Sequence, residues 1–238
     1  LTDFRIDNFY GLFGINEINY FASILFSIFV FVITINSYNL IDGIDGLAGG
    51  YAVIAMASFL FINYVNSKTI SIILCVTIIG SLIGFLKFNL SPKKRKIFMG
   101  DTGSLIIGFL ITVLVLIMLS SKNNYTDDFP NLPVYVLATL SYPYIDTLRV
   151  MFIRKKNKQK FFEPDKNHIH HKLINAGKSH ISSTIIILSV YLSSIVFCIL
   201  FHEINITIHF IISLLYSLLS LLALVFIFNK KWMIIRYV

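Results

Sequence analysis

The sequence predicts an all-α, polytopic membrane helix bundle with about seven transmembrane helices. Hydrophobic residues make up 56% of the 238 residues, and charged residues only 13%, whereas an ordinary soluble domain carries about a quarter charged residues. The mean hydropathy is +0.79. The apolar residues also gather in stretches of roughly 20, the length that a helix needs to cross a bilayer. A soluble fold is therefore excluded.

Seven apolar stretches are long enough to span a membrane. They cover about residues 18–39, 47–65, 69–88, 104–120, 132–153, 182–202 and 205–229. Pro143 lies inside the fifth stretch and predicts a kink or a break there, because proline lacks the backbone N–H that a helix requires. Cys75 and Cys198 both lie within spans, so no disulfide framework is predicted. We expect a single integral-membrane domain over residues 1–238.

Positive charge alternates between the connections. Lys and Arg concentrate in residues 87–96, 154–178 and 230–236, and the positive-inside rule places these three segments in the cytoplasm. The intervening connections carry little positive charge and are expected outside, which puts residues 36–46 on the cytoplasmic face as well. The net charge of +8 then reflects topology, with some attraction to anionic lipid, and does not indicate nucleic acid binding.

The first polar cluster follows the first span. Asn36, Asn39, Asp42 and Asp45 recur at every third residue, and a glycine follows each aspartate. Such glycines are expected to end the helix. Amides and carboxylates that line a loop are suited to bind a base or ribose, and to ligate a hard cation through oxygen. An Asp-Gly turn is the alternative, although a turn does not require four spaced amides and acids.

The second cluster precedes the fourth span and runs from Phe98 through Asp101 to Ser104. Helix capping is the alternative explanation, because such residues are common N-caps. Capping accounts for one polar residue only, and leaves the nearby glycines and Phe98 unexplained. Phe98 can stack on a base. A helix N-terminus beside an aspartate also favours a magnesium-bound phosphate.

The third cluster contains His168, His170 and His171. In an extended segment the first two share a face, and in a helix the first and third do. Three histidines suggest a zinc site. Other zinc ligands are not expected beside them, because both cysteines lie in spans and no helix carries a matching pair of an acid and a histidine. Basic neighbours instead favour hydrogen bonds to a diphosphate. Asp146 lies one helical turn before Arg149. These two residues either belong to the same site as the histidines or form a simple ion pair.

Taken in order, these motifs resemble those of the polyprenyl-phosphate N-acetylhexosamine-1-phosphate transferase family. They lie at residues 36–48, 98–104, 146–149 and 165–171. The histidine segment is similar to the bacterial branch that starts O-antigen, enterobacterial common antigen and teichoic acid linkage synthesis. The resemblance implies transfer of a sugar 1-phosphate, commonly N-acetylglucosamine 1-phosphate, from a UDP-sugar to undecaprenyl phosphate, releasing UMP. This would be the first membrane step of a cell-envelope polysaccharide, in the bacterial inner membrane with cytoplasmic active-site loops.

The resemblance also assigns roles to residues. It implies Mg²⁺, with Mn²⁺ as the alternative metal, ligated by Asn39 and Asp101. It implies catalytic roles for Asp42, Asp45, Asp101 and His168. The substrate-binding residues that it implies are Asn36, Asn39, Phe98, Asp146, Arg149, Lys166, His168, His170 and His171. The expected partners are the UDP-sugar, undecaprenyl phosphate and the lipid bilayer, with a homodimer as one option.

One feature of the family is absent from this sequence. The family carries an adjacent aspartate pair upstream of the first motif, whereas the Asp-Asp pair here is Asp127-Asp128, in an external connection. The sequence thus resembles the C-terminal portion of the family fold, lacking its N-terminal helices. The alternative function is a catalytically inactive fragment or pseudoenzyme that binds UDP-sugar without transfer. A transporter is disfavoured, because an ion path needs acids at mid-depth of the membrane.

Overall fold

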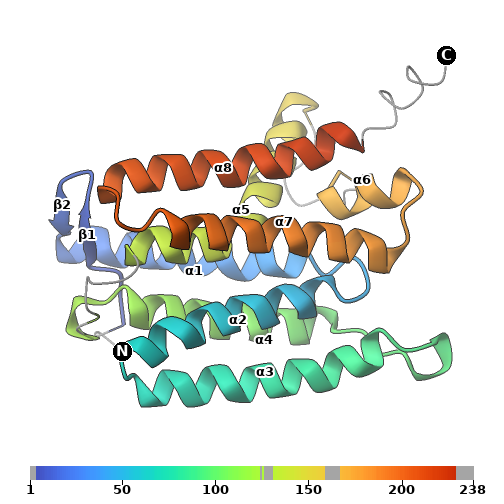
Figure 1. Cartoon of the computed structure of the whole chain (residues 1–238), viewed down its shortest axis with the longest axis horizontal. Helices are drawn as coiled ribbons and strands as arrows, with labels where there is room; N and C mark the ends of the chain where they lie inside the picture. Colours follow the sequence, from blue (N-terminus) through green and yellow to red (C-terminus); the bar gives the residue numbers. More distant parts are fainter. Residues whose placement is uncertain (1–3, 124, 126–130, 159–166, 229–238) are drawn as a thin grey trace.

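Long helices lie side by side along one direction of the molecule (Figure 1). The computed structural model describes residues 4–123, 125, 131–158 and 167–228. Its elements in chain order are β1 (Asn8–Leu12), β2 (Ile15–Glu17), α1 (Tyr20–Leu40), α2 (Leu47–Val65), α3 (Thr69–Asn89), α4 (Gly100–Met118), α5 (Leu132–Lys156), α6 (Ile169–Asn175), α7 (His180–Leu200) and α8 (Ile206–Ile227), with 3₁₀ turns at Lys93–Arg95 and Ser121–Asn123.

The seven predicted spans correspond to α1 to α5, α7 and α8. Six of these helices are long and apolar enough to cross a membrane; α5 is the exception among them. The second half of α5 carries Asp146, Arg149 and three basic residues at its end. This helix packs against α1, α2, α7 and α8, and its Asp146 and Arg154 side chains are buried. The predicted all-α multi-pass membrane bundle is confirmed.

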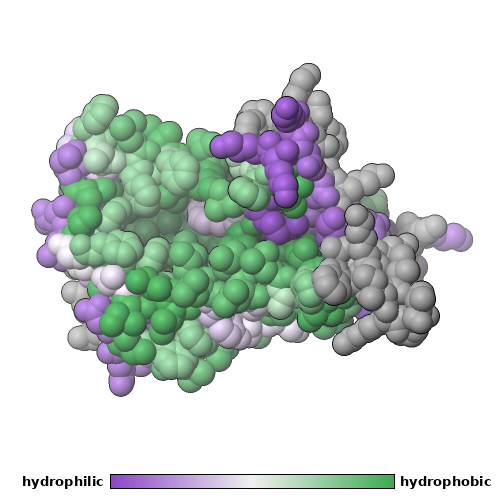
Figure 2. Space-filling model, turned by 90° about the horizontal axis from the view of Figure 1, so that it is seen from above, coloured by the Kyte–Doolittle hydropathy of each residue, from purple (hydrophilic) through white to green (hydrophobic). Residues whose placement is uncertain are grey.

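The connections separate into two groups at opposite ends of the bundle. The α1–α2 turn, the α3–α4 connection and α6 lie at the right of Figure 1, whereas the β-hairpin and the α2–α3 and α7–α8 connections lie at the left. Figure 2 shows a largely hydrophobic surface, with hydrophilic residues gathered in patches toward either end. The three predicted motif segments therefore meet at one end of the molecule.

Helix α5 is continuous through Pro143, so of the predicted kink or break the break is wrong. Proline cannot donate a hydrogen bond to the carbonyl four residues earlier, which belongs to Thr139. The hydroxyl groups of Tyr51 from α2 and Tyr191 from α7 donate to this oxygen instead, at 3.1 and 2.7 Å. Neighbouring helices thus satisfy the carbonyl that proline leaves without a donor, as a membrane interior requires.

A close helix crossing brings α1 beside α4. A Cβ atom added to Gly108 of α4 would lie 3.1 Å from the Cα atom of Ile35 in α1. Small residues permit this approach between membrane helices. Near the C-terminal end of α1, the Tyr38 hydroxyl donates to the Ala48 carbonyl at 3.1 Å and contacts the Met99 sulfur at 3.5 Å. The end of α1 and the start of α4 are therefore held together.

The β-hairpin was not predicted. It lies at the end opposite the motifs, where the Phe13 N–H donates to the Thr207 hydroxyl at 3.0 Å. The carboxylate of Asp7, just before the hairpin, accepts a 2.8 Å hydrogen bond from the backbone N–H of Ser121. These bonds tie the N-terminal segment to α8 and to the end of α4.

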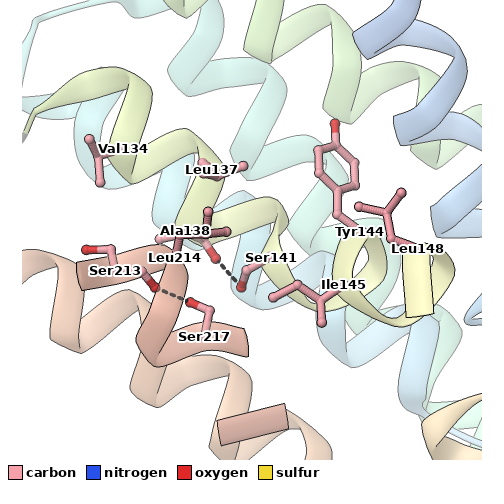
Figure 3. Close-up of a pocket in the computed structure, with 10 residues that line it drawn as sticks. All are labelled: Val134, Leu137, Ala138, Ser141, Tyr144, Ile145, Leu148, Ser213, Leu214 and Ser217. Atoms are coloured by element: carbon pink, nitrogen blue, oxygen red, sulfur yellow. Dashed lines mark hydrogen bonds between the residues drawn. The ribbon is translucent and has the colours of Figure 1, made fainter. Parts of the chain in front are cut away.

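A small cavity lies between α5 and α8 (Figure 3). Its volume is about 90 Å³, and its lining is almost wholly apolar, with Ser141 from α5 and Ser213 and Ser217 from α8 as small polar exceptions. Ligand sites for molecules of drug size are usually several times larger. This cavity is therefore too small and too apolar to hold a nucleotide sugar.

Candidate active site

The turn between α1 and α2 carries the first motif. Helix α1 ends at Leu40, as the glycine pattern predicted, and Gly46 adopts a left-handed conformation with φ of 77°. Only glycine adopts this conformation without strain. Asn39 lies in the last turn of α1, and Asp42 lies in the turn itself. Asn36 is exposed one turn earlier, and its amide donates to the Val32 carbonyl of its own helix at 2.7 Å.

Asn39 connects the first motif to the second. Its amide nitrogen donates to the Ser104 hydroxyl at 2.7 Å and to a carboxylate oxygen of Asp101 at 3.3 Å. The Ser104 hydroxyl donates to the Gly100 carbonyl at 3.1 Å. These bonds fix the amide group through its nitrogen, and its oxygen is a separate acceptor that can serve a ligand.

Asp42 lies beside the start of α4. Burial raises the pKa of the Asp42 carboxyl group, the Gly100 backbone N–H that donates to it lowers that pKa, and the nearby charge of Asp101 raises it. Two carboxylates that disfavour each other's ionised form are stabilised by a cation. The first and second motifs thus create a negatively charged cluster, defined here as the acidic cluster of Asn39, Asp42 and Asp101.

The second motif does not act as a helix cap. Helix α4 begins at Gly100, whose φ is 65°, and the preceding Met99 makes no side-chain capping bond. Asp101 lies in the first turn with an exposed side chain. The acid therefore remains available to a ligand, in a position where the helix dipole favours bound anions nearby.

The acidic cluster has a composition that fits Mg²⁺. This ion prefers oxygen ligands and is usually held by one or two carboxylates together with water and substrate phosphates. Asp42 and Asp101 supply carboxylates, and Asn39 supplies an amide oxygen. Among the described residues, no three His, Cys, Asp or Glu side chains come together as a closed metal cage.

Asp146 organises the histidine segment. The Asp146 side chain is wholly buried. One carboxylate oxygen lies 2.9 Å from His168 Nδ1, and the other accepts from Arg149 at 2.8 Å and from the backbone N–H of Ile169 at 3.0 Å. With these contacts Asp146 fixes the ring of His168 from the Nδ1 side, which leaves Nε2 for other partners. The Asp146–Arg149 ion pair therefore also holds the histidine segment in place.

The rest of this segment continues the network. Arg149 also donates to the Asn167 carbonyl, and the ammonium group of Lys172 lies 3.2 Å from the Asn167 side-chain oxygen. Lys166, a predicted substrate-binding residue, lies outside the described residues, as does the pair Asp127-Asp128.

His170 brings the third motif against the first. Its side chain is 1% exposed, and its ring stacks on that of His168 with centroids 5.6 Å apart and lies 4.2 Å from the ring of His171. A Cβ atom added to Gly43 would lie only 2.2 Å from His170 Nε2. Glycine is therefore required at position 43 because the histidine ring packs directly on the turn.

Asp45, the second aspartate of the first motif, contacts basic residues of two other elements. Its carboxylate forms an ion pair with Lys96, in the connection before α4, and lies 3.4 Å from His180 Nδ1 at the start of α7. Phe98, two residues after Lys96, is 75% exposed. The Lys96 ammonium lies 5.4 Å from the centroid of the Phe98 ring.

Sequence reasoning missed several residues that hold the site. Lys96 joins Asp45, and Asn89 joins the turn to the α3–α4 connection. Ser104 was named in the second cluster, but its bond to Asn39 was not expected. Gly43 was treated only as a helix terminator. The spacing of the motifs contains no signal for these contacts, because each joins residues that are more than 40 positions apart.

We expect Gly43→Ala to disrupt the contact between the first and third motifs. The new methyl group must displace the buried His170 ring, and overpacking of this kind costs about 1–3 kcal/mol of folding stability. Thermal unfolding of the purified protein measures this cost. Gly84→Ala is the matched control, because a Cβ atom there meets no heavy atom within 4 Å. Equal melting temperatures for the two variants would contradict the packing.

Acid should destabilise the protein through His170. Burial, and next the charge of His171, lower the pKa of His170 from 6.5 to about 3. The unfolded chain therefore binds a proton that the folded chain does not, and stability is lost as pH falls from 6.5 toward 3. At pH 5 this loss amounts to roughly 2 kcal/mol. His170→Asn should flatten the pH dependence of unfolding over this window, as measured by thermal unfolding at a series of pH values, and an unchanged slope would contradict the burial of the neutral ring.

Comparison with known proteins finds related sequences. A family model described as "Glycosyl transferase family 4" matches residues 1–119. A Bacillus subtilis protein, "Probable undecaprenyl-phosphate N-acetylglucosaminyl 1-phosphate transferase", is 38% identical over 69% of this chain and 43% of its own length. An Escherichia coli K12 protein, "Undecaprenyl-phosphate alpha-N-acetylglucosaminyl 1-phosphate transferase", is 33% identical over 60% of this chain and 38% of its own length. The chain thus spans about two fifths of the length of these relatives.

Proposed function

Because the chain belongs to glycosyl transferase family 4, we propose that it acts in the transfer of N-acetylglucosamine 1-phosphate, or a related sugar 1-phosphate, from a UDP-sugar to undecaprenyl phosphate. UMP is the leaving product. The names of the bacterial relatives support the acceptor and the transferred group. The proposed setting is the first membrane step of a cell-envelope polysaccharide, at the inner membrane, with the motif segments facing the cytoplasm.

One observation carries this proposal: three separate segments meet at one end of the bundle. Asn39 contacts Asp101 and Ser104, and the Gly43 turn packs on His170. A negatively charged cluster therefore lies next to a segment rich in imidazole groups. This combination is suited to a diphosphate, because a cation on the acidic side and hydrogen-bond donors on the histidine side can both contact phosphate oxygens.

Each group has a defined part in the proposed reaction. Asn39, Asp42 and Asp101 would hold Mg²⁺, which supplies neutralisation of the diphosphate charge. His168, oriented by Asp146, and the adjacent His170 and His171 would contact the diphosphate and sugar. Phe98 would stack on the uracil, with Asn36, Arg149 and Lys166 as further substrate contacts.

In the reaction itself, an oxygen of undecaprenyl phosphate forms a bond to the phosphorus that bears the sugar. The bridging bond from this phosphorus to the UMP oxygen breaks, and UMP leaves with that bonding pair. No oxidant or reductant is required. The protein contributes chiefly position and charge, which is the usual basis of phosphoryl transfer.

The proposal is tested by UMP release. Membranes that contain the protein are supplied with UDP-N-acetylglucosamine, undecaprenyl phosphate and Mg²⁺, and UMP is quantified against a sample without the lipid. We expect UMP to form only when lipid and metal are both present. A protein that binds UDP-N-acetylglucosamine but releases no UMP would instead be the inactive binder.

The proposed orientation has its own test. Single cysteines at positions 94 and 158, in two basic connections, should be protected from a membrane-impermeant thiol reagent in intact cells, because the positive-inside rule places both in the cytoplasm. Cysteine at position 203, in the α7–α8 connection, should react. Labelling of position 94 or 158 from outside would contradict the orientation.

A further inference from the structure

The connection between α3 and α4 presents Phe98 at the same end of the bundle as the motifs. The Phe98 side chain is 75% exposed. Its stacking on a base would be weakened if the connection were free to move, because ordering of a free segment on binding costs entropy. Contacts that hold this connection in the unbound protein therefore determine how well the ring can bind.

Asn89 holds the backbone next to the ring. Its side chain is 5% exposed at the end of α3. The amide nitrogen donates to the Ile97 carbonyl at 2.9 Å, and the amide oxygen accepts from the Gly46 N–H at 2.7 Å. The residue just before Phe98 is therefore joined through Asn89 to the turn that carries the first motif.

Lys96 makes a second link between the same two segments. Its ammonium group pairs with the Asp45 carboxylate, and the two side chains are only 21% and 18% exposed. Partial burial makes such a pair stronger than one at an open surface. The same ammonium lies 5.4 Å from the centroid of the Phe98 ring, within the range of a cation–π contact.

Asp45 is in turn anchored to α7. Its backbone carbonyl accepts a 2.7 Å hydrogen bond from the Thr184 hydroxyl, and its carboxylate lies 3.4 Å from His180 Nδ1. The carboxylate thus faces two cationic or polar partners on neighbouring elements. Both contacts reach the same carboxylate oxygen, Oδ2, from elements on either side of the turn, and this arrangement fits a fixed support.

We propose that Lys96 and Asp45 are positioning residues, whose ion pair holds the Phe98 ring in the orientation that a planar nucleotide base requires. The ligand class is a pyrimidine nucleotide. This inference rests on the proposed function, and it gives Asp45 a part different from the direct catalytic one that the family resemblance implied. Lys96 acts through Phe98 and has no contact with the reacting atoms.

The test is a double-mutant cycle on UMP binding, measured by calorimetry on the purified chain in Mg²⁺ buffer. Phe98→Leu should weaken UMP binding roughly tenfold by removing the stacking surface. Lys96→Met keeps the aliphatic stem and should weaken binding about fivefold. Because Lys96 acts through the ring, the double variant should lose about tenfold and not fiftyfold. Lys94→Met, an exposed neighbour, is the matched control and should bind normally.

A charge exchange gives an independent check that does not depend on one variant folding well. Lys96→Asp alone should weaken UMP binding, and Lys96→Asp combined with Asp45→Lys should restore most of the affinity. Additive losses in the cycle, or normal UMP binding by Lys96→Met, would overturn the inference while leaving the proposed function intact. Failure of the unaltered chain to bind UMP at all would overturn both.

Discussion

Asp101→Asn is expected to lower turnover at least about a hundredfold, while the affinity for the UDP-sugar changes less. The substitution keeps the size of the side chain and removes a negative charge. Asp101 contacts Asn39 at 3.3 Å and lies close enough to Asp42 to raise the pKa of its carboxyl group. Loss of charge in this cluster acts mainly on the charge that develops during the reaction, which lowers kcat more than binding.

The measurement is UMP release at saturating UDP-N-acetylglucosamine over a range of Mg²⁺ concentrations. Thr102→Val is the matched control, because Thr102 is the exposed neighbour of Asp101 in the same helical turn, and it should remain close to normal. Near-normal turnover of Asp101→Asn across the whole Mg²⁺ titration would remove Asp101 from the proposed metal site.

Asp146→Ala should be the most destabilising single substitution in the histidine network. It leaves the largely buried Arg149 without its carboxylate and removes the acceptor of the Ile169 N–H and the partner of His168. Breaking a buried ion pair from one side costs about 3–5 kcal/mol. Asp146→Asn retains an acceptor oxygen and should cost less.

Denaturant or thermal unfolding in detergent measures this effect. Glu203→Gln, an exposed acid in the α7–α8 connection, is the control and should change stability by less than about 0.5 kcal/mol. An Asp146→Ala protein as stable as this control would show that the network does not hold the histidine segment.

The helices themselves were largely predictable, because an apolar run of this length has few alternatives to a membrane helix. The short helix α6 was not predicted. It has only seven residues, and its burial of Ile169 and Leu173 depends on contacts with distant helices. The continuity of α5 was also missed, because the tyrosines that satisfy the Thr139 carbonyl lie on α2 and α7.

The site was predicted in part. The family resemblance implied Asn39 and Asp101 as ligands of one metal ion, and the structure brings their side chains into contact. The resemblance did not indicate that Asp45 turns away to pair with Lys96, since the partner lies in a basic connection whose charge was fully explained by topology. The packing of His170 on Gly43 was likewise hidden, because only the folded chain reveals the close approach of helix α6 to the α1–α2 turn.

The central claim is that the acidic cluster and the histidine segment form one site for a nucleotide sugar. Titration of the purified chain with UDP-N-acetylglucosamine, with and without Mg²⁺, tests it most directly. We expect a single binding event that requires Mg²⁺ and that is weakened roughly tenfold by Asp42→Asn and, separately, by His168→Asn, since each removes contacts to a charged ligand. Binding that is indifferent to Mg²⁺ and to both substitutions would contradict the claim.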